Sequence, residues 1–109
     1  MDKIAQPLDK YLQLASQSAL LVSQADKANL DVLLTMLGPV DKDIIVAYYG
    51  LFGSMRMSAA QLAAKYRITP EAILDIIMKD LRRLSITPEW QMMLRQLSPM
   101  VRRRIIPKE

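Results

Sequence analysis

Cysteine and histidine are both absent from the 109 residues. Their absence excludes disulfides, thiolate nucleophiles and the usual zinc sites, and it removes the commonest general base at neutral pH. The sequence also contains no glycine-rich phosphate loop and no pairing of a nucleophile with a base. We therefore expect neither an enzyme nor a protein that holds a metal ion or a cofactor.

Long apolar runs are missing too. A run such as ALLV at 19–22 is far shorter than the ~20 residues that a helix needs to span a bilayer. The start MDKIAQPLDK lacks the basic beginning and apolar core of a signal peptide. We expect a cytoplasmic protein with no membrane partner.

Glycine and phenylalanine are scarce, with three and one residues, and β-branched runs are few. This favours an all-α fold over a sheet.

The net charge of +4 is distributed unevenly. Residues 1–54 carry four lysines against six aspartates, whereas residues 55–109 carry eleven basic against five acidic residues. The basic second half indicates contact with a polyanion, or else a solvated basic surface.

Apolar residues at helical spacing predict helices over 8–23 and 26–37, joined either by a break or as one continuous helix. We assign residues 1–38 to an N-terminal helical segment for docking or dimerisation, with 8–37 as the surface of a possible homodimer. A third helix is expected over 41–49, capped by Asp41 or a neighbour and ended by a left-handed glycine.

The phrase ITPE occurs twice, at 68–71 and 86–89. Each copy predicts a helix start, with threonine as N-cap, proline at the first helical position and glutamate in the positive first turn. Helices over 70–84 and 88–97 follow. The last residues, 99–109, form a basic tail that we expect to fray or to dock onto a partner.

Two short helices, at 58–66 and 70–84, are joined by the tight turn Arg67-Ile68-Thr69. A serine caps the first helix, Ala63 is small enough for close packing, and an apolar side chain occupies the turn. Together these features predict a helix-turn-helix, within a domain over 39–98.

Residues from about 40 to 84 resemble the C-terminal promoter-reading domain (the fourth region) of bacterial primary sigma factors. VDKDIIVAYYGLFG is similar to that family's opening helix, which ends in a phrase like Tyr49-Gly50-Leu51. MSAAQLAAKYRITPEAILDIIMKDLRRL is similar to its helix-turn-helix, which ends in a run like Leu81-Arg82-Arg83-Leu84. The resemblance does not extend to the N-terminal 38 residues.

The departures lie on the second helix, where the family presents arginines, a glutamate and a glutamine to DNA bases. The glutamate is kept as Glu71, but the arginine positions hold Pro70, Ala72 and Leu74, and the glutamine position holds Asp75. Bidentate reading of guanine by arginine or of adenine by glutamine is therefore lost. Basic residues of the unit keep the ability to contact phosphates, which positions a protein without specifying sequence.

Two sets of site residues follow. The residues predicted to contact DNA are Ser58, Lys65, Arg67, Thr69, Glu71, Asp75, Lys79, Arg82, Arg83, Arg102, Arg103 and Arg104. The resemblance also implies docking onto the flap of the RNA polymerase β subunit. The residues predicted to contact protein are Ile44, Ile45, Tyr48, Tyr49, Leu51, Phe52, Leu74 and Met78.

The leading hypothesis is a bacterial or phage transcription regulator that binds RNA polymerase through the β flap, double-stranded promoter DNA, or both. One alternative is a protein–protein interaction module in which the helix-turn-helix is only a scaffold. The other is a dimeric sequence-specific repressor.

Overall fold

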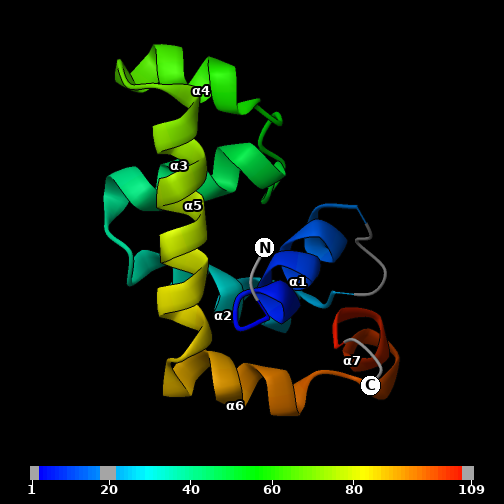
Figure 1. Ribbon diagram of the computed structural model, residues 1–109. Helices are drawn as coiled ribbons and strands as arrows, with labels where there is room; N and C mark the ends of the chain where they lie inside the picture. The colour runs from blue at the N-terminus through cyan, green and yellow to red at the C-terminus, as the bar shows by residue number, and fades with distance from the viewer. Residues whose placement is uncertain (1–2, 18–21, 107–109) are drawn as a thin grey trace.

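The computed structural model describes residues 3–17 and 22–106, which are helical without a strand among them (Figure 1). The predicted all-α class is confirmed. The helices are α1 (Gln6–Gln17), α2 (Gln24–Thr35), α3 (Pro39–Tyr49), α4 (Ala59–Tyr66), α5 (Pro70–Ser85), α6 (Pro88–Gln96) and α7 (Pro99–Ile105).

The first two helices are separate, because Ser23 adopts an extended conformation and N-caps α2 by accepting a hydrogen bond from the backbone of Asp26. Val22 lies in a bend, so its predicted place in the first helix is wrong. The rest of that prediction beyond residue 17, with Ala19, falls on 18–21 and lies outside the described residues.

Local capping chemistry sets most other boundaries. Thr69 and Thr87 accept hydrogen bonds from the backbone N–H groups three residues on, and a proline follows each at the start of its helix. Gly50 ends α3 in the left-handed conformation with φ 70°. These expectations are confirmed. Helix α3 begins earlier than predicted, at Pro39, so Asp41 lies in its first turn and is not its N-cap.

Helix α5 runs along the length of the molecule and contacts α1, α3, α4 and α6 (Figure 1). Its buried stripe of Ile73, Ile77, Leu81 and Leu84 belongs to one hydrophobic core to which every helix contributes. Residues from the N-terminal 38, from 39–98 and from the tail therefore bury their apolar side chains together.

The tail is not frayed up to residue 106. Residues Pro99–Ile105 form α7, which packs against α1 and buries Val101 and Ile105. Ser98 caps this helix by accepting from the backbone of Val101 at 3.3 Å. The expectation of a frayed or partner-docked tail is wrong here, because the (i, i+4) apolar pair has a partner within the chain itself.

Candidate functional site: the helix-turn-helix and its outer face

Helices α4 and α5 form the predicted helix-turn-helix. Ser58 and Gln61 make a reciprocal capping box at the start of α4, with hydrogen bonds of 3.1 and 2.8 Å. Arg67 ends α4 in the left-handed conformation with φ 58°, and the Ile68 N–H donates to the Ala63 carbonyl at 3.0 Å. The chain thereby turns within three residues, so that α4 lies across the start of α5 (Figure 1).

Asp43 of α3 contacts the last turn of α4 through its side chain. Its carboxylate accepts a hydrogen bond from the Tyr66 hydroxyl and an ion-paired one from Lys65 Nζ at 2.9 Å. The Tyr66 hydrogen bond, followed by the Lys65 contact, lowers the pKa of Asp43. Lys65, a predicted phosphate contact, is thus already engaged within the chain, although both partners remain solvent-exposed and the pair is weak.

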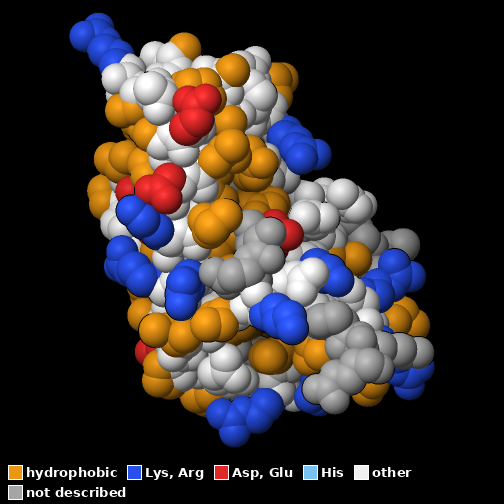
Figure 2. Space-filling view, in the orientation of Figure 1, with side chains coloured by type: hydrophobic (Ala, Val, Ile, Leu, Met, Phe, Trp, Pro, Cys, Tyr) orange, Lys and Arg blue, Asp and Glu red, His pale blue; other side chains and the backbone are white. Residues whose placement is uncertain are grey.

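The outer face of α5 is uncovered by the described residues. Leu74 and Met78 are 46% and 42% exposed, one turn apart. Beside them, Asp75 pairs with Lys79 at 2.9 Å, and Glu71 is exposed in the first turn. Figure 2 shows acidic side chains over the first half of α5 and basic ones over its second half, where Arg82 and Arg83 lie.

Half of the predicted protein-binding set belongs to the interior. Ile44, Ile45, Tyr49 and Leu51 are buried in the hydrophobic core, so the structure removes them from the predicted surface. Helix α3 is contacted by α1, α2, α4 and α5, which leaves it little outward face. Burial, followed by a hydrogen bond to Asp9, raises the pKa of Tyr49.

Of the remaining four, Tyr48 and Leu74 lie together. They line an open groove of about 570 Å³ where α3, α4 and α5 meet, with Arg56 and Met57 from the preceding loop. The Met57 N–H donates to the Ala47 carbonyl at 2.9 Å, which holds this loop against α3. The sequence does not indicate Arg56 and Met57 as part of this groove, because loop residues carry no periodicity that shows which way they face.

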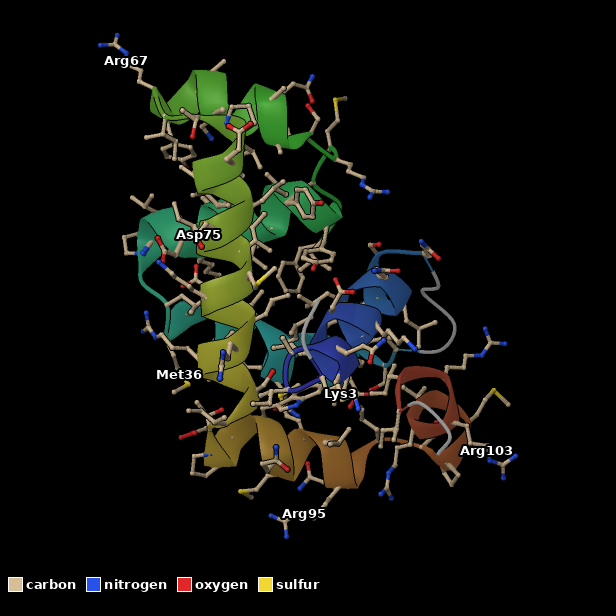
Figure 3. All side chains as sticks on the ribbon, viewed as in Figure 1. Lys3, Met36, Arg67, Asp75, Arg95 and Arg103 are labelled. Carbon is tan, nitrogen blue, oxygen red and sulfur yellow. The ribbon has the colours of Figure 1, made fainter. Side chains whose placement is uncertain are left out.

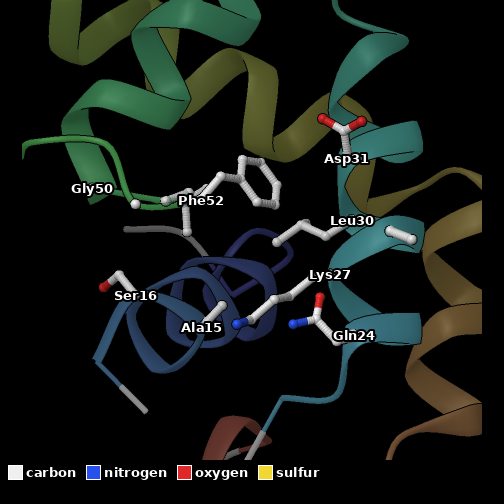
Figure 4. A pocket seen from close by; sticks show the side chains of 11 residues that line it. Ala15, Ser16, Gln24, Lys27, Leu30, Asp31, Gly50 and Phe52 are labelled. Carbon is white, nitrogen blue, oxygen red and sulfur yellow. The ribbon is translucent and has the colours of Figure 1, made fainter. Parts of the chain in front are cut away.

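Phe52 lies elsewhere. It lines a separate pocket of about 700 Å³ between α1, α2 and the loop after α3, where its ring points toward Leu30 (Figure 4). Lys27 and Asp31 contribute charges of both signs to this pocket. Phe52 and Leu74 therefore belong to different surfaces.

The predicted DNA-contacting residues are all exposed, but they do not form one surface. Arg67 lies at the tip of the helix-turn-helix, whereas Arg103 of α7 lies at the opposite end of the molecule (Figure 3). The hydroxyl oxygens of Ser58 and Thr69 already accept the backbone hydrogen bonds that cap α4 and α5. Arg82, Arg83 and Lys79 remain grouped at the C-terminal half of α5.

Comparisons with protein-family models, with curated proteins and with solved structures found no match to this chain. No helix in the described part of the chain has the length and apolarity that crossing a bilayer requires. Residues 3–17 and 22–106 also bring no three acidic side chains into an arrangement that would hold a metal ion.

Proposed function

We propose that the chain is a bacterial or phage transcription regulator that uses a sigma-like helix-turn-helix to bind RNA polymerase, with the flap of the β subunit as its contact. The observation that carries this proposal is the outer face of α5, where Leu74 and Met78 are exposed in place of hydrogen-bonding groups. The groove lined by Tyr48, Met57 and Leu74 extends the same apolar surface toward α3.

The physical chemistry of this face favours protein over DNA bases. Burying Leu74 and Met78 against an apolar partner removes hydrocarbon from water, which is favourable by about 25 cal/mol per Å². Against DNA, the carboxylates of Glu71 and Asp75 would face phosphates and repel them. Methionine is also suited to adaptable protein contacts.

The double variant Leu74→Ala with Met78→Ala is expected to weaken capture of the purified β subunit at least tenfold, since central apolar anchors contribute about 1–2 kcal/mol or more each. Both side chains are outside the core, so the far-ultraviolet circular dichroism spectrum should not change. Binding would be measured by titration calorimetry. Met100→Ala, which truncates an exposed side chain of α7, is the matched control and should bind as the wild type does. Equal affinity of the double variant and the control would contradict this role of α5.

Promoter DNA is the second candidate partner, and the basic end of α5 favours it. Arg82 and Arg83 are exposed in the last turn, and Arg67 projects from the tip of the same helix-turn-helix (Figure 3). Contacts of this kind position a protein on the duplex without reading its sequence.

Replacing both Arg82 and Arg83 by alanine is expected to weaken binding to any duplex uniformly and to reduce the salt dependence of log K by about one unit per lost phosphate contact. Fluorescence anisotropy at several salt concentrations measures both quantities. Lys3→Ala, an exposed cation outside the predicted DNA-contacting set, is the control and should leave both unchanged. Binding that is absent or insensitive to salt would remove DNA as a partner.

A further inference from the structure

Helix α6 lies at an edge of the molecule and presents one face that the described residues leave uncovered (Figure 1). Trp90 and Met93 point into the core, whereas Glu89, Met92 and Arg95 are exposed. Arg95 is seen in Figure 3 projecting away from the body of the molecule. Met92 is 54% exposed at the middle of this face.

The apolar part of this face continues onto α2. Val32 is 67% exposed, and Met36 lies four residues further on, at the C-cap of the same helix. A hollow of about 240 Å³ lies between α2 and α6 with Val32 and Met92 in its lining. We call Val32, Met36, Glu89, Met92 and Arg95 the α2–α6 face. Glu89 also lines this hollow, beside Val32 and Met92. Large exposed apolar side chains that adjoin in this way mark association surfaces.

The two charged side chains of this face lie on either side of Met92 along α6. Glu89 lies three residues before it and Arg95 three residues after it, so charges of opposite sign stand at equal distances along the helix. Neither side chain forms an ion pair with any described residue, and Arg95 donates only a long hydrogen bond of 3.4 Å to the Gln91 carbonyl within that part of the chain. Both charges are thus free to meet a partner.

This order is self-complementary. If two copies of α6 run antiparallel about a two-fold axis at Met92, Met92 meets its own equivalent. Glu89 of each copy then faces Arg95 of the other, as an isologous interface requires. A parallel arrangement would instead place like charges opposite each other. A nucleic acid would meet apolar side chains and the carboxylate of Glu89, which give it little to bind.

We propose that a second copy of this chain covers the α2–α6 face, making a two-fold homodimer with Met92 next to the axis. Val32, Met36 and Met92 supply the buried apolar contact, while Glu89 and Arg95 fix the antiparallel register, because charge pairs at a rim govern orientation more than affinity. In this arrangement α4 and the first turns of α5 lie away from the interface, so both helix-turn-helix units stay accessible (Figure 1). The proposal does not depend on the partner of the outer face of α5.

The absence of native cysteine allows a direct test of the axis. The full-length variant Met92→Cys is expected to form an intermolecular disulfide under mild oxidation, because equivalent residues at a two-fold axis come within the short Cα separation that a disulfide needs. Met100→Cys, similarly exposed but on α7, is the control and should remain largely uncrosslinked. Equal crosslinking of the two variants would overturn the placement of the axis.

Charge reversal tests the register and the dimer together. Sedimentation equilibrium of the wild type is expected to give twice the 12.4 kDa chain mass at high micromolar concentration. Glu89→Arg or Arg95→Glu alone should shift the dissociation constant upward about tenfold by placing like charges opposite each other, and the double reversal should restore it. A wild type that stays at the chain mass overturns the dimer. A dimer indifferent to both single reversals overturns the α2–α6 face as its interface.

Discussion

Replacing Trp90 by alanine is expected to lower the free energy of unfolding by about 3–5 kcal/mol, as truncation of a buried large aromatic side chain does. Trp90 is the largest of the fully buried side chains and the only tryptophan of the chain. A domain of this size has roughly 5–15 kcal/mol of stability in total, so the loss is a large share of it.

The location of Trp90 explains why the cost should be high. Its ring lies 5.5 Å from the ring of Tyr11, centroid to centroid, and so joins α6 near one end of the chain to α1 near the other. The hydroxyl of Tyr11 is buried with no hydrogen-bond partner among the described residues, and burial raises the pKa of this group. Truncation of Trp90 to alanine would remove the ring against which Tyr11 packs.

Chemical denaturation followed by far-ultraviolet circular dichroism measures the effect, since the variant lacks the tryptophan that fluorescence would use. Trp90→Phe should lose less than Trp90→Ala, because most of the aromatic contact persists. Met100→Ala, an exposed truncation, should change stability by no more than about 0.5 kcal/mol. An alanine variant as stable as the wild type would mean that Trp90 does not hold α1 and α6 together.

The second large effect concerns Asp80, whose replacement by asparagine is expected to stabilise the protein at alkaline pH by about 2–4 kcal/mol. Asp80 lies on the core side of α5 and is only 3% exposed. No donor among the described residues reaches its Oδ2, and Arg83 Nη1 stands 3.9 Å from its Oδ1. Burial, followed by the facing carboxyl of Asp41, raises the pKa of Asp80 to about 7.

The direction of the pH dependence follows from the two states of this group. An unfolded aspartate has a pKa of about 3.9, so between that value and about 7 the folded protein holds a proton that the unfolded chain has released. Unfolding then releases a proton, and stability falls as pH rises through this window. Below it both states are protonated, and above it both are ionised, so the curve is flat on either side.

Thermal unfolding across pH 4 to pH 9 is the measurement. Wild-type stability should decline toward neutral pH, whereas Asp80→Asn should be flatter, because the asparagine amide is neutral at every pH. The control is Asp75→Asn, on the exposed face of α5, which should keep the wild-type slope. Parallel curves for the wild type and Asp80→Asn would show that Asp80 does not titrate in this window.

Features that depend on neighbouring residues in the chain were predictable. Thr69 and Thr87 cap their helices through backbone groups only three residues away, so the phrase ITPE specifies a start wherever it stands. Gly50 is similar, because a left-handed C-cap selects glycine directly. The helix-turn-helix outline followed from these caps together with the apolar stripe of α5.

Features that depend on packing between helices distant in the sequence were not predictable. Ile44 and Tyr49 were assigned to a surface because the sigma-factor resemblance implies protein docking there, but four helices enclose α3. Helical spacing places Asp80 beside Ile77 and Leu84, but only the packing of α3 against α5 shows that it is a buried acid facing Asp41. Helix α7 was missed because seven residues between prolines carry little periodicity, and its burial depends on α1.

We propose that the outer face of α5 binds RNA polymerase. Affinity purification of the chain from its native cell, in parallel with the double variant Leu74→Ala with Met78→Ala, tests it most directly. We predict that the β subunit elutes with the wild-type chain, survives a high-salt wash because the contact is apolar, and is strongly depleted with the double variant. An eluate that contains only DNA, or neither DNA nor the β subunit, would contradict the claim.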